Sequence, residues 1–308
     1  MQNVLVNFNG EILPWNQADR VSVLDRSYLY GDSLYEVVRT FDGIPVHLRE
    51  HLDRLYASAR LCQMEVAQTP ELWVREIRKT VDAFHKLPGC HQSEAYVRMV
   101  LSRGTGKIGF GLQNLLTPSQ YSLIVQPLEA PDSKAFEKGA HLGISKRIRN
   151  DRRALDPAMK SGNYLNSLLA YLETTQDSPY GDAILLDRMD FVTEGTTFNL
   201  FYVKKRIVVT SPLDIGILDG ITRKFTLENA RNEGFETREV RFKKEHLFEA
   251  DEVFLTSTTK DVFPVTAIDG KRIANGKPGK VTRLLKESFN ARIPEFKNAA
   301  LAYFPDAH

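Results

Sequence analysis

The stretch Leu155-Asp-Pro-Ala-Met-Lys160-Ser-Gly-Asn163-Tyr164-Leu-Asn166 places one lysine in a short polar loop just before a helical pattern. The apolar residues that follow recur at helical spacing and predict an amphipathic helix: Tyr164, Leu165, Leu168, Leu169 and Leu172. A single lysine is normally a solvated surface charge. Lys160 is therefore a candidate catalytic residue only if the rest of the chain supplies groups that work with it.

The composition is that of an ordinary globular protein and points to a small-molecule ligand. The 308 residues are 42% apolar and 26% charged, and 41 basic residues nearly balance 39 acidic ones. The charges are mixed along the chain, so no basic stripe suits nucleic acid or a membrane surface. No metal site is expected.

The two cysteines and the N-terminus indicate a cytoplasmic protein. Cys62 and Cys90 are too few for a disulfide framework and form no CxxC pair, which favours a reducing compartment. No apolar run approaches the roughly 18 residues of a membrane span, and the chain starts directly with a strand and turn.

The first half of the chain alternates short strands and helices. Strands are expected at residues 4–8 and 11–14, 35–41, 93–101 and 121–125, with helices whose apolar faces include Leu52 and Val74. Along residues 93–101 the side chains alternate, so Tyr96 and Arg98 share one face. Arg54 falls off the apolar stripe of its helix. The glycine-rich segment 103–111 is expected to be a flexible loop.

The second half repeats this mixture after a polar segment at residues 129–134. Strands are expected at residues 140–145, 182–186, 199–203, 207–210, 237–241 and 252–256, and helices after Lys160, after Gly220 and at residues 278–290. The prediction is a mixed α/β (α+β) fold with two domains. Residues 1–127 form a smaller N-terminal domain, 128–135 the linker, and 136–308 a larger C-terminal domain.

Three stretches of the second half carry groups that could work with Lys160. Val192-Thr-Glu194-Gly195-Thr-Thr-Phe-Asn199 places one carboxylate between two strands. A glutamate in a loop is usually solvated, yet one fixed inside a cleft could keep a pyridinium nitrogen protonated. Leu218-Asp-Gly220-Ile221-Thr222 opens a helix, where free N–H groups favour an anion, although plain capping is the simpler alternative. Thr256-Ser-Thr-Thr259 adds hydroxyls at the end of a strand.

Lysine, carboxylate and anion pocket together have a chemical meaning that none has alone. Pyridoxal phosphate needs an amine to form an imine, an acid near its ring nitrogen, and neutral donors with one arginine around its phosphate. This chain contains each of these groups.

These motifs resemble the class IV pyridoxal-phosphate aminotransferases, which include branched-chain and D-amino acid aminotransferases and aminodeoxychorismate lyase. The resemblance runs from about residue 3 to 293 and rests on Asp25-Arg-Ser-Tyr-Leu-Tyr-Gly-Asp-Ser-Leu-Tyr-Glu, Glu50-His-Leu-Asp-Arg54, Lys160-Ser-Gly-Asn-Tyr-Leu, Thr193-Glu-Gly-Thr-Thr-Phe-Asn-Leu-Phe, Gly220-Ile-Thr-Arg and Thr256-Ser-Thr-Thr. It implies the two-domain fold of D-amino acid aminotransferase-like proteins, with a larger, barrel-like C-terminal domain, and a homodimer.

The resemblance also implies roles for individual residues. Lys160 matches the Schiff-base lysine, which would act as general acid and base, and Glu194 matches the carboxylate on the pyridine nitrogen. The remaining cofactor contacts that it implies are Arg54, Ile221, Thr222 and Thr258 at the phosphate, Leu218 against the ring and Tyr164 at the ring hydroxyl. The implied substrate residues are Tyr30, Tyr35, Tyr96, Arg98 and Thr259.

The family pattern is divided on the substrate. Tyr96-Val-Arg98 and Tyr164 resemble branched-chain enzymes, and Ile108 and Phe110 replace the Arg-x-His pair of D-specific ones. In contrast, Tyr35-Glu-Val-Val and Thr256-Ser-Thr-Thr are closer to enzymes of D-amino acids or (R)-amines. The preferred prediction is a ping-pong transaminase that uses a branched-chain L-amino acid and a 2-oxo acid such as 2-oxoglutarate. A D-amino acid or amine transaminase, a lyase, and a cofactor-binding protein without turnover are the alternatives.

Overall fold

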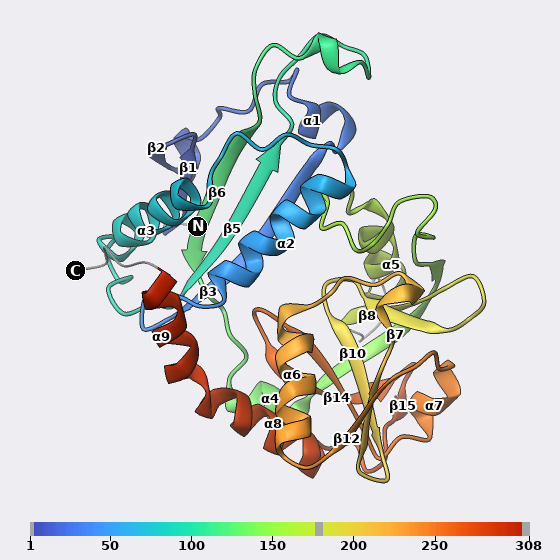
Figure 1. Ribbon diagram of the computed structural model, residues 1–308. Helices are drawn as coiled ribbons and strands as arrows, with labels where there is room; N and C mark the ends of the chain where they lie inside the picture. Colours follow the sequence, from blue (N-terminus) through green and yellow to red (C-terminus); the bar gives the residue numbers. More distant parts are fainter. Residues whose placement is uncertain (1–2, 176–180, 304–308) are drawn as a thin grey trace. The chain divides into compact units, whose positions relative to one another are not determined.

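The computed structural model describes residues 3–175 and 181–303, in two units that each contain one β-sheet (Figure 1). The first unit comprises Met1–Glu129, Met159–Asn163 and Ile293–His308. The second comprises Ala130–Ala158 and Tyr164–Arg292. Lys160 therefore belongs to the first unit, whereas the helix that follows it belongs to the second. In the described part of the chain, no helix has both the length and the hydropathy needed to cross a membrane.

The first unit is built on a six-stranded antiparallel sheet. Its strand order is β2-β1-β6-β5-β3-β4. The strands are β1 (Leu5–Phe8), β2 (Glu11–Pro14), β3 (Ser33–Phe41), β4 (Ile44–Pro45), β5 (Ala95–Ser102) and β6 (Gln120–Pro127). The expected turn at Asn9-Gly10 joins β1 to β2, and both residues have positive φ, as a tight hairpin requires.

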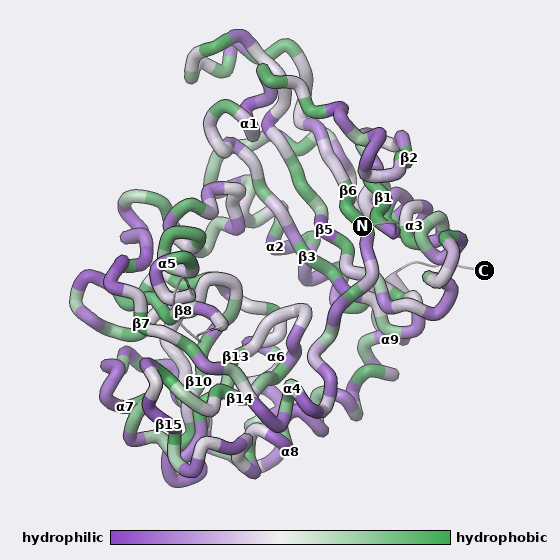
Figure 2. Tube along the Cα trace, turned by 180° about the vertical axis from the view of Figure 1, so that it is seen from behind, coloured by the Kyte–Doolittle hydropathy of each residue, from purple (hydrophilic) through white to green (hydrophobic). Residues whose placement is uncertain are grey.

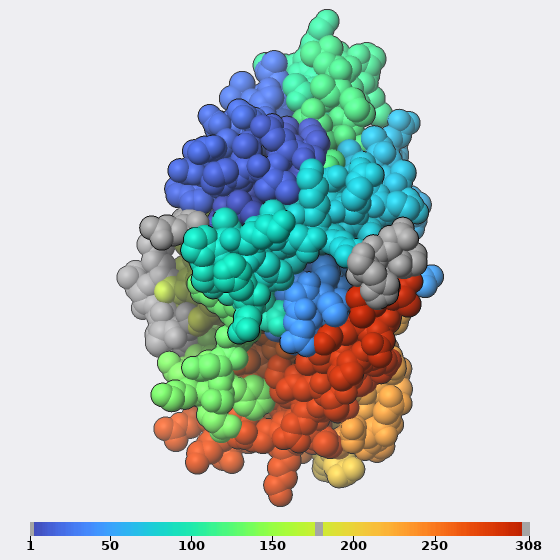
Figure 3. Space-filling model, turned by 90° about the vertical axis from the view of Figure 1, so that its left-hand side faces the viewer, coloured from blue at the N-terminus to red at the C-terminus, as the bar shows by residue number. Residues whose placement is uncertain are grey.

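Helices cover one face of this sheet and complete its core. Figure 1 shows α2 (Leu48–Leu61) and α3 (Pro70–His85) on that face. Leu52, Trp73 and Met99 are among the buried residues of this core. The unit also contains α1 (Arg26–Tyr30) and α9 (Ile293–Tyr303), and Figure 3 shows the outer side of α3 at its surface.

The alternation predicted along β5 is confirmed. Ala95, Val97, Met99 and Leu101 are completely buried beneath the helices. Tyr96 and Arg98 lie on the opposite face and are half-buried. This strand therefore presents a tyrosine and an arginine side by side on the face away from the core.

The second unit is built on a nine-stranded mixed sheet. The order is β12-β11-β10-β13-β14-β7-β8-β9, with β15 paired to β14. The strands are β7 (Ala140–Ile148), β8 (Asp182–Leu186), β9 (Val192–Gly195), β10 (Asn199–Lys204), β11 (Ile207–Thr210), β12 (Glu236–Glu239), β13 (Glu252–Ser257), β14 (Asp261–Ile268) and β15 (Lys271–Arg272). The predicted mixed α and β fold is confirmed.

Two hydrophobic clusters lie on opposite faces of this sheet. Phe201 and Phe254 pack with the face of α6 (Ile221–Asn232) and α8 (Lys280–Ala291), while Leu200 and Leu255 belong to the other cluster. The further helices are α4 (Ser133–Lys138), α5 (Leu165–Thr175) and α7 (Lys244–Phe248), and short 3-10 turns are η1 (Trp15–Gln17), η2 (Leu112–Asn114) and η3 (Leu213–Ile215). Ser133 and Lys134 of the expected linker begin α4.

Helix α5 is amphipathic, but its most apolar side chains face outward in the single chain. Its buried residues are Ser167, Ala170 and Thr174. Leu165, Leu168 and Leu172 are 64%, 47% and 42% exposed. The tube is accordingly coloured hydrophobic over much of α5 (Figure 2).

Candidate active site

Lys160 lies in a short segment that runs alongside the first residues of β3 and is hydrogen-bonded to them. The Lys160 amide donates to Ser58 Oγ at 3.1 Å, and its carbonyl accepts from the Tyr35 amide at 3.0 Å. The Gly162 amide donates to the Ser33 carbonyl at 2.8 Å. These backbone hydrogen bonds hold Lys160 in the way that a strand is held at the edge of a sheet. The sequence had predicted a loop at this position.

Two predicted site residues, Lys160 and Arg98, lie against the ring of Tyr35. Lys160 Nζ donates to the Tyr35 hydroxyl at 2.9 Å and lies 4.3 Å from the ring centroid. The Arg98 guanidinium carbon lies 4.1 Å from the same centroid. Both cations are close enough for cation–π attraction. Tyr96 is on the same face of β5 as Arg98, so the first unit brings this part of the predicted substrate set together.

Arg54 is held by a carboxylate that the sequence had not marked. Its Nε and Nη2 donate to the two Glu36 oxygens at 2.7 and 2.8 Å. His51 Nδ1 lies 2.7 Å from Glu36 Oε2. Glu36 is completely buried and Arg54 nearly so. A bidentate pair of this kind fixes the plane of the guanidinium, which suits recognition of a phosphate.

Burial and charge set the protonation states of this cluster. Burial alone would raise the pKa of Glu36, but the charge and hydrogen bonds of Arg54, with the His51 bond, hold that pKa well below its usual range. Burial lowers the pKa of His51, and the hydrogen bond and charge of Glu36 offset this only in part. At neutral pH Glu36 is ionised and His51 is neutral.

Tyr30 contacts the glycine-rich loop instead of the Tyr35 cluster. Its hydroxyl accepts from the Gly109 amide at 2.9 Å, and its ring centroid is 5.2 Å from that of Phe110. Arg26 Nη1 donates to the Gly109 carbonyl at 3.0 Å. The loop tip itself is open, because Ile108 and Phe110 are 76% and 81% exposed. These contacts assign Tyr30 to anchoring the loop, and its predicted substrate role stays a prediction.

In the second unit, Glu194 is a residue of strand β9 and is buried, whereas the sequence suggested a loop. Glu194 Oε1 accepts from Arg149 at 2.9–3.0 Å. Glu194 Oε2 accepts from the Leu218 amide at 3.0 Å and, over a long 3.3 Å, from Asn199 Nδ2. Asn199 Nδ2 also donates to the Leu218 carbonyl at 3.0 Å. The weak Asn199 bond leaves Oε2 able to accept a further donor.

Arg149, which sequence reasoning missed, is the ionic partner of the predicted site residue Glu194. It directly follows β7, and nothing in its spacing distinguishes it from the other arginines of the segment 147–153. Only the tertiary fold brings it to Glu194. Because a buried carboxylate is stable only when it is paired, Arg149 supplies the charge partner that Glu194 needs in this position.

The start of α6 has the expected free N–H groups. Its N-cap residue is Gly220, no side chain caps the helix, and its first turn contains no acidic residue. A β-carbon at Gly220 would lie 2.0 Å from Asn199 Oδ1, so only glycine fits. The amides of Ile221 and Thr222 therefore lack partners within the helix, as at other helix starts that bind anions, and their predicted phosphate role stays a prediction.

Three further predicted residues lie in a turn or next to a helix: Thr258, Thr259 and Tyr164. Thr258 and Thr259 form the turn between β13 and β14, since Ser257 pairs with Asp261. Tyr164 immediately precedes α5, and its carbonyl accepts from the Leu168 amide at 2.8 Å. The cofactor and substrate roles of these three residues stay predictions.

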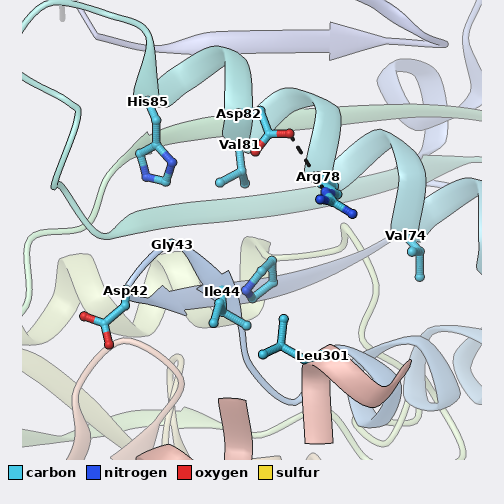
Figure 4. A pocket seen from close by; sticks show the side chains of 10 residues that line it. Asp42, Gly43, Ile44, Val74, Arg78, Val81, Asp82, His85 and Leu301 are labelled. Carbon is cyan, nitrogen blue, oxygen red and sulfur yellow. Dashed lines mark ion pairs between the residues drawn. The ribbon is translucent and has the colours of Figure 1, made fainter. Parts of the chain in front are cut away.

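A groove of about 280 Å³ in the first unit contains none of the predicted residues. Figure 4 shows α3 along one side, with the turn at Asp42–Ile44 and Leu301 of α9 opposite. Arg78 and Asp82 of α3 form a loose ion pair there at 4.0 Å. This groove has no lysine or buried carboxylate and is not the candidate active site.

Comparisons with known proteins identify the family to which this chain belongs. Residues 33–268 match the family model described as amino-transferase class IV. D-alanine aminotransferase of Bacillus licheniformis is 34% identical, covering 94% of this chain and 96% of the relative. Branched-chain-amino-acid aminotransferase of Escherichia coli K12 is 32% identical, covering 92% and 90%. The chain belongs to the class IV aminotransferases.

Solved structures of the family also resemble this fold closely. A branched-chain amino acid aminotransferase from the organism abbreviated T.th., solved with pyridoxamine 5'-phosphate, has a TM-score of 0.84 and 30% identity, with 96% of both chains covered. The same enzyme is solved with N-(5'-phosphopyridoxyl)-L-glutamate, at a TM-score of 0.83. Both compounds carry the pyridine and phosphate groups that the sequence predicted.

The first prediction concerns the pair of Arg149 and Glu194. Arg149→Met leaves a buried carboxylate without its cation, which costs about 3–5 kcal/mol of unfolding free energy. Urea unfolding of the apoprotein measures the loss, and Arg149→Met combined with Glu194→Gln should recover part of it. The control is Arg147→Met, which removes an exposed ion pair of 3.8 Å on β7 and should cost less than about 1 kcal/mol. Equal losses in the two single variants would refute the buried pairing.

The second prediction concerns acid stability. With its pKa lowered in the fold, His51 binds fewer protons than in the unfolded chain, so its contribution is lost as the pH falls below about 6.5, by up to about 1.4 kcal/mol per pH unit. His51→Gln should therefore flatten the dependence of the unfolding free energy on pH between about 7 and 5.5. His91→Gln, at an exposed histidine, should leave the slope as in the wild type. A slope unaffected by His51→Gln would contradict the neutral state of His51.

Proposed function

We propose that the protein is a pyridoxal-phosphate-dependent transaminase that passes the amino group of a branched-chain L-amino acid to a 2-oxo acid such as 2-oxoglutarate. The reaction is ping-pong: the donor leaves as its 2-oxo acid before the acceptor enters. The observation that carries the proposal is the Lys160 amine, held at the Tyr35 hydroxyl in a class IV aminotransferase. The pyridoxamine 5'-phosphate found with the T.th. enzyme supports the choice of pyridoxal phosphate.

The residues present fit this cofactor chemically. When bound, pyridoxal phosphate supplies an electron sink that stabilises negative charge at the substrate α-carbon. Lys160 is proposed to anchor it and then to move the proton at the α-carbon as general acid and base. Glu194, held in place by Arg149, would keep the ring nitrogen protonated. The uncapped start of α6 and the fixed guanidinium of Arg54 are suited to the phosphate, together with Thr258.

The remaining contacts are assigned by the same proposal. Leu218 would pack against the ring, and Tyr164 would bond its hydroxyl. Arg98 would receive the substrate carboxylate, with Tyr35, Tyr96 and Thr259 beside it and Tyr30 at the loop. The position of Arg98 over the Tyr35 ring supports its assignment, because Lys160 contacts the same ring.

A D-amino acid donor is the second candidate. The D-alanine aminotransferase of Bacillus licheniformis is 34% identical to this chain, and Tyr35-Glu-Val-Val resembles D-specific enzymes. Against it, the loop carries Ile108 and Phe110 where those enzymes have a cationic pair, and both side chains are open. A hydrophobic loop tip is better suited to an aliphatic side chain than to a second carboxylate.

The third prediction tests this function. Purified protein mixed with pyridoxal phosphate and L-leucine should shift its absorbance from the imine to the pyridoxamine form, and 2-oxoglutarate should reverse the shift. Lys160→Ala should slow this half-reaction at least about 100-fold, because the variant lacks both the anchor and the proton-transfer group. The exposed lysine variant Lys134→Ala should react at the wild-type rate.

The same assay separates the candidates when it is run with paired L- and D-amino acids and a chiral amine. Faster reaction with D-alanine than with L-leucine would favour the second candidate. Release of pyruvate without an acceptor would identify a lyase. Absence of any spectral shift, or full activity of Lys160→Ala, would overturn the transaminase mechanism.

We further propose that the protein is a homodimer in the cytoplasm. The exposed Leu165, Leu168 and Leu172 stripe of α5 supports burial against a second copy, because monomers rarely expose contiguous apolar surface. The free thiols of Cys62 and Cys90 agree with a reducing compartment, which cell fractionation can check.

The fourth prediction concerns this assembly. In sedimentation velocity the wild type should migrate at twice the mass of the chain, and Leu168→Glu should shift it toward the monomer by placing a charge in an apolar interface. Val240→Glu, at an apolar residue outside α5 that is 43% exposed, should not change the mass. A dimer that tolerates Leu168→Glu would exclude α5 from the interface.

A further inference from the structure

One buried hydroxyl in the second unit makes no hydrogen bond within the described part of the chain. Thr256 is 2% exposed, and its Oγ1 makes no hydrogen bond to any residue that the structure describes. Leaving a buried polar group unsatisfied costs about 1–3 kcal/mol, so such groups are rare and commonly functional. Several other buried threonines of this unit donate to a carbonyl, among them Thr210 to Leu200 and Thr226 to Thr222, both at 2.7 Å.

The strand register places Thr256 on the face that carries the proposed cofactor groups. Thr256 lies directly opposite Asn199 across β10 and β13. Directly opposite residues of antiparallel strands point to the same face. The Asn199 side chain contacts Glu194 and the Leu218 carbonyl, and its Oδ1 sits against Gly220. Thr256 therefore lies on the same side as the start of α6.

The packing of β13 agrees with this placement. Phe254, two residues before Thr256 and so on the same face, packs with Leu227 and Ala230 of α6. The Thr256 hydroxyl therefore lies on the face of the sheet that α6 covers. Asn199, its cross-strand neighbour, lies near the first residues of α6.

The local chemistry is a surplus of donors. The first turn of α6 has unpartnered amides, with neither a capping side chain nor an acidic residue. Thr256 adds a buried O–H, and Thr258 adds another hydroxyl two residues later. A phosphate monoester offers three acceptor oxygens and negative charge, which such a group of donors would satisfy.

We propose that Thr256 is a further ligand of the cofactor phosphate, donating its hydroxyl from β13 beside the amides at the start of α6. The inference rests on the proposed function, since it requires a phosphorylated cofactor. It assigns to this site a residue that the sequence motif alone did not distinguish from a strand threonine.

The test compares pyridoxal phosphate with pyridoxal, which lacks the phosphate. Apoprotein is titrated with each compound by absorbance, and the wild type should prefer the phosphorylated one. Thr256→Val should weaken pyridoxal phosphate binding about 10-fold or more, as for a lost hydrogen bond to a charged group, and leave pyridoxal binding unchanged. The ³¹P chemical shift of the bound phosphate should move as well. Thr256→Ser, which keeps the donor, should retain the wild-type preference.

Apoprotein stability supplies an independent readout. Because the Thr256 hydroxyl has no partner to lose, Thr256→Val should unfold at the wild-type temperature or above it. The control Thr210→Val breaks an existing bond and should lower the unfolding temperature, without changing the ratio of the two binding constants. Loss of stability or of folding in Thr256→Val, or an unchanged binding ratio and ³¹P shift, would overturn the assignment. A wild type that binds pyridoxal phosphate no better than pyridoxal would overturn the proposed cofactor as well.

Discussion

In each unit of the protein one buried carboxylate lies among the predicted site residues, and the cost of desolvating its charge organises the groups around it. Glu36 is held by Arg54 and His51 in the first unit. Glu194 is held by Arg149 and the Leu218 amide in the second. Removing either cation would leave an unpaired buried charge, at a cost of several kcal/mol. The carboxylates thereby fix two elements that the proposed function uses: the plane of the Arg54 guanidinium and the Leu218 backbone before α6.

In the second unit a hydrogen-bond acceptor, the Glu194 carboxylate, lies apart from a group of donors, the amides at the start of α6. At Glu194 a carboxylate is available, whereas at Gly220–Thr222, only two residues beyond Leu218, amides lack acceptors. Such a surface is complementary to a ligand with an N–H cation at one end and an anion at the other. Pyridoxal phosphate carries a protonated pyridine nitrogen and a phosphate in such an arrangement. The uncapped start of α6 at Gly220 therefore indicates this ligand only in combination with Glu194.

Regular patterns in the sequence predicted most of the fold, and the failures have physical causes. The alternation along β5 is strong because one face is buried and the other is not. Strand β14 was missed, because it is buried on both faces and contains Pro264, so it shows neither alternation nor a typical strand composition. Motifs selected Lys160, Glu194 and Arg54 as candidate site residues. They could not locate Arg149, Glu36 or His51 as partners, because those pairs form only when distant strands and helices fold together.

The conflicting substrate motifs meet at one side chain. Tyr35 belongs to a motif closer to D-specific enzymes, and Arg98 to one typical of branched-chain enzymes, yet Arg98 stacks on the Tyr35 ring while Lys160 bonds its hydroxyl. With Lys160 engaged by the cofactor as proposed, the Tyr35 hydroxyl would lose this donor and would be able to donate to the substrate carboxylate that the proposal assigns to Arg98. Recognition of the substrate is then coupled to the state of the lysine. A change at Tyr35 would therefore alter both at once, and stereopreference cannot be assigned to either motif separately.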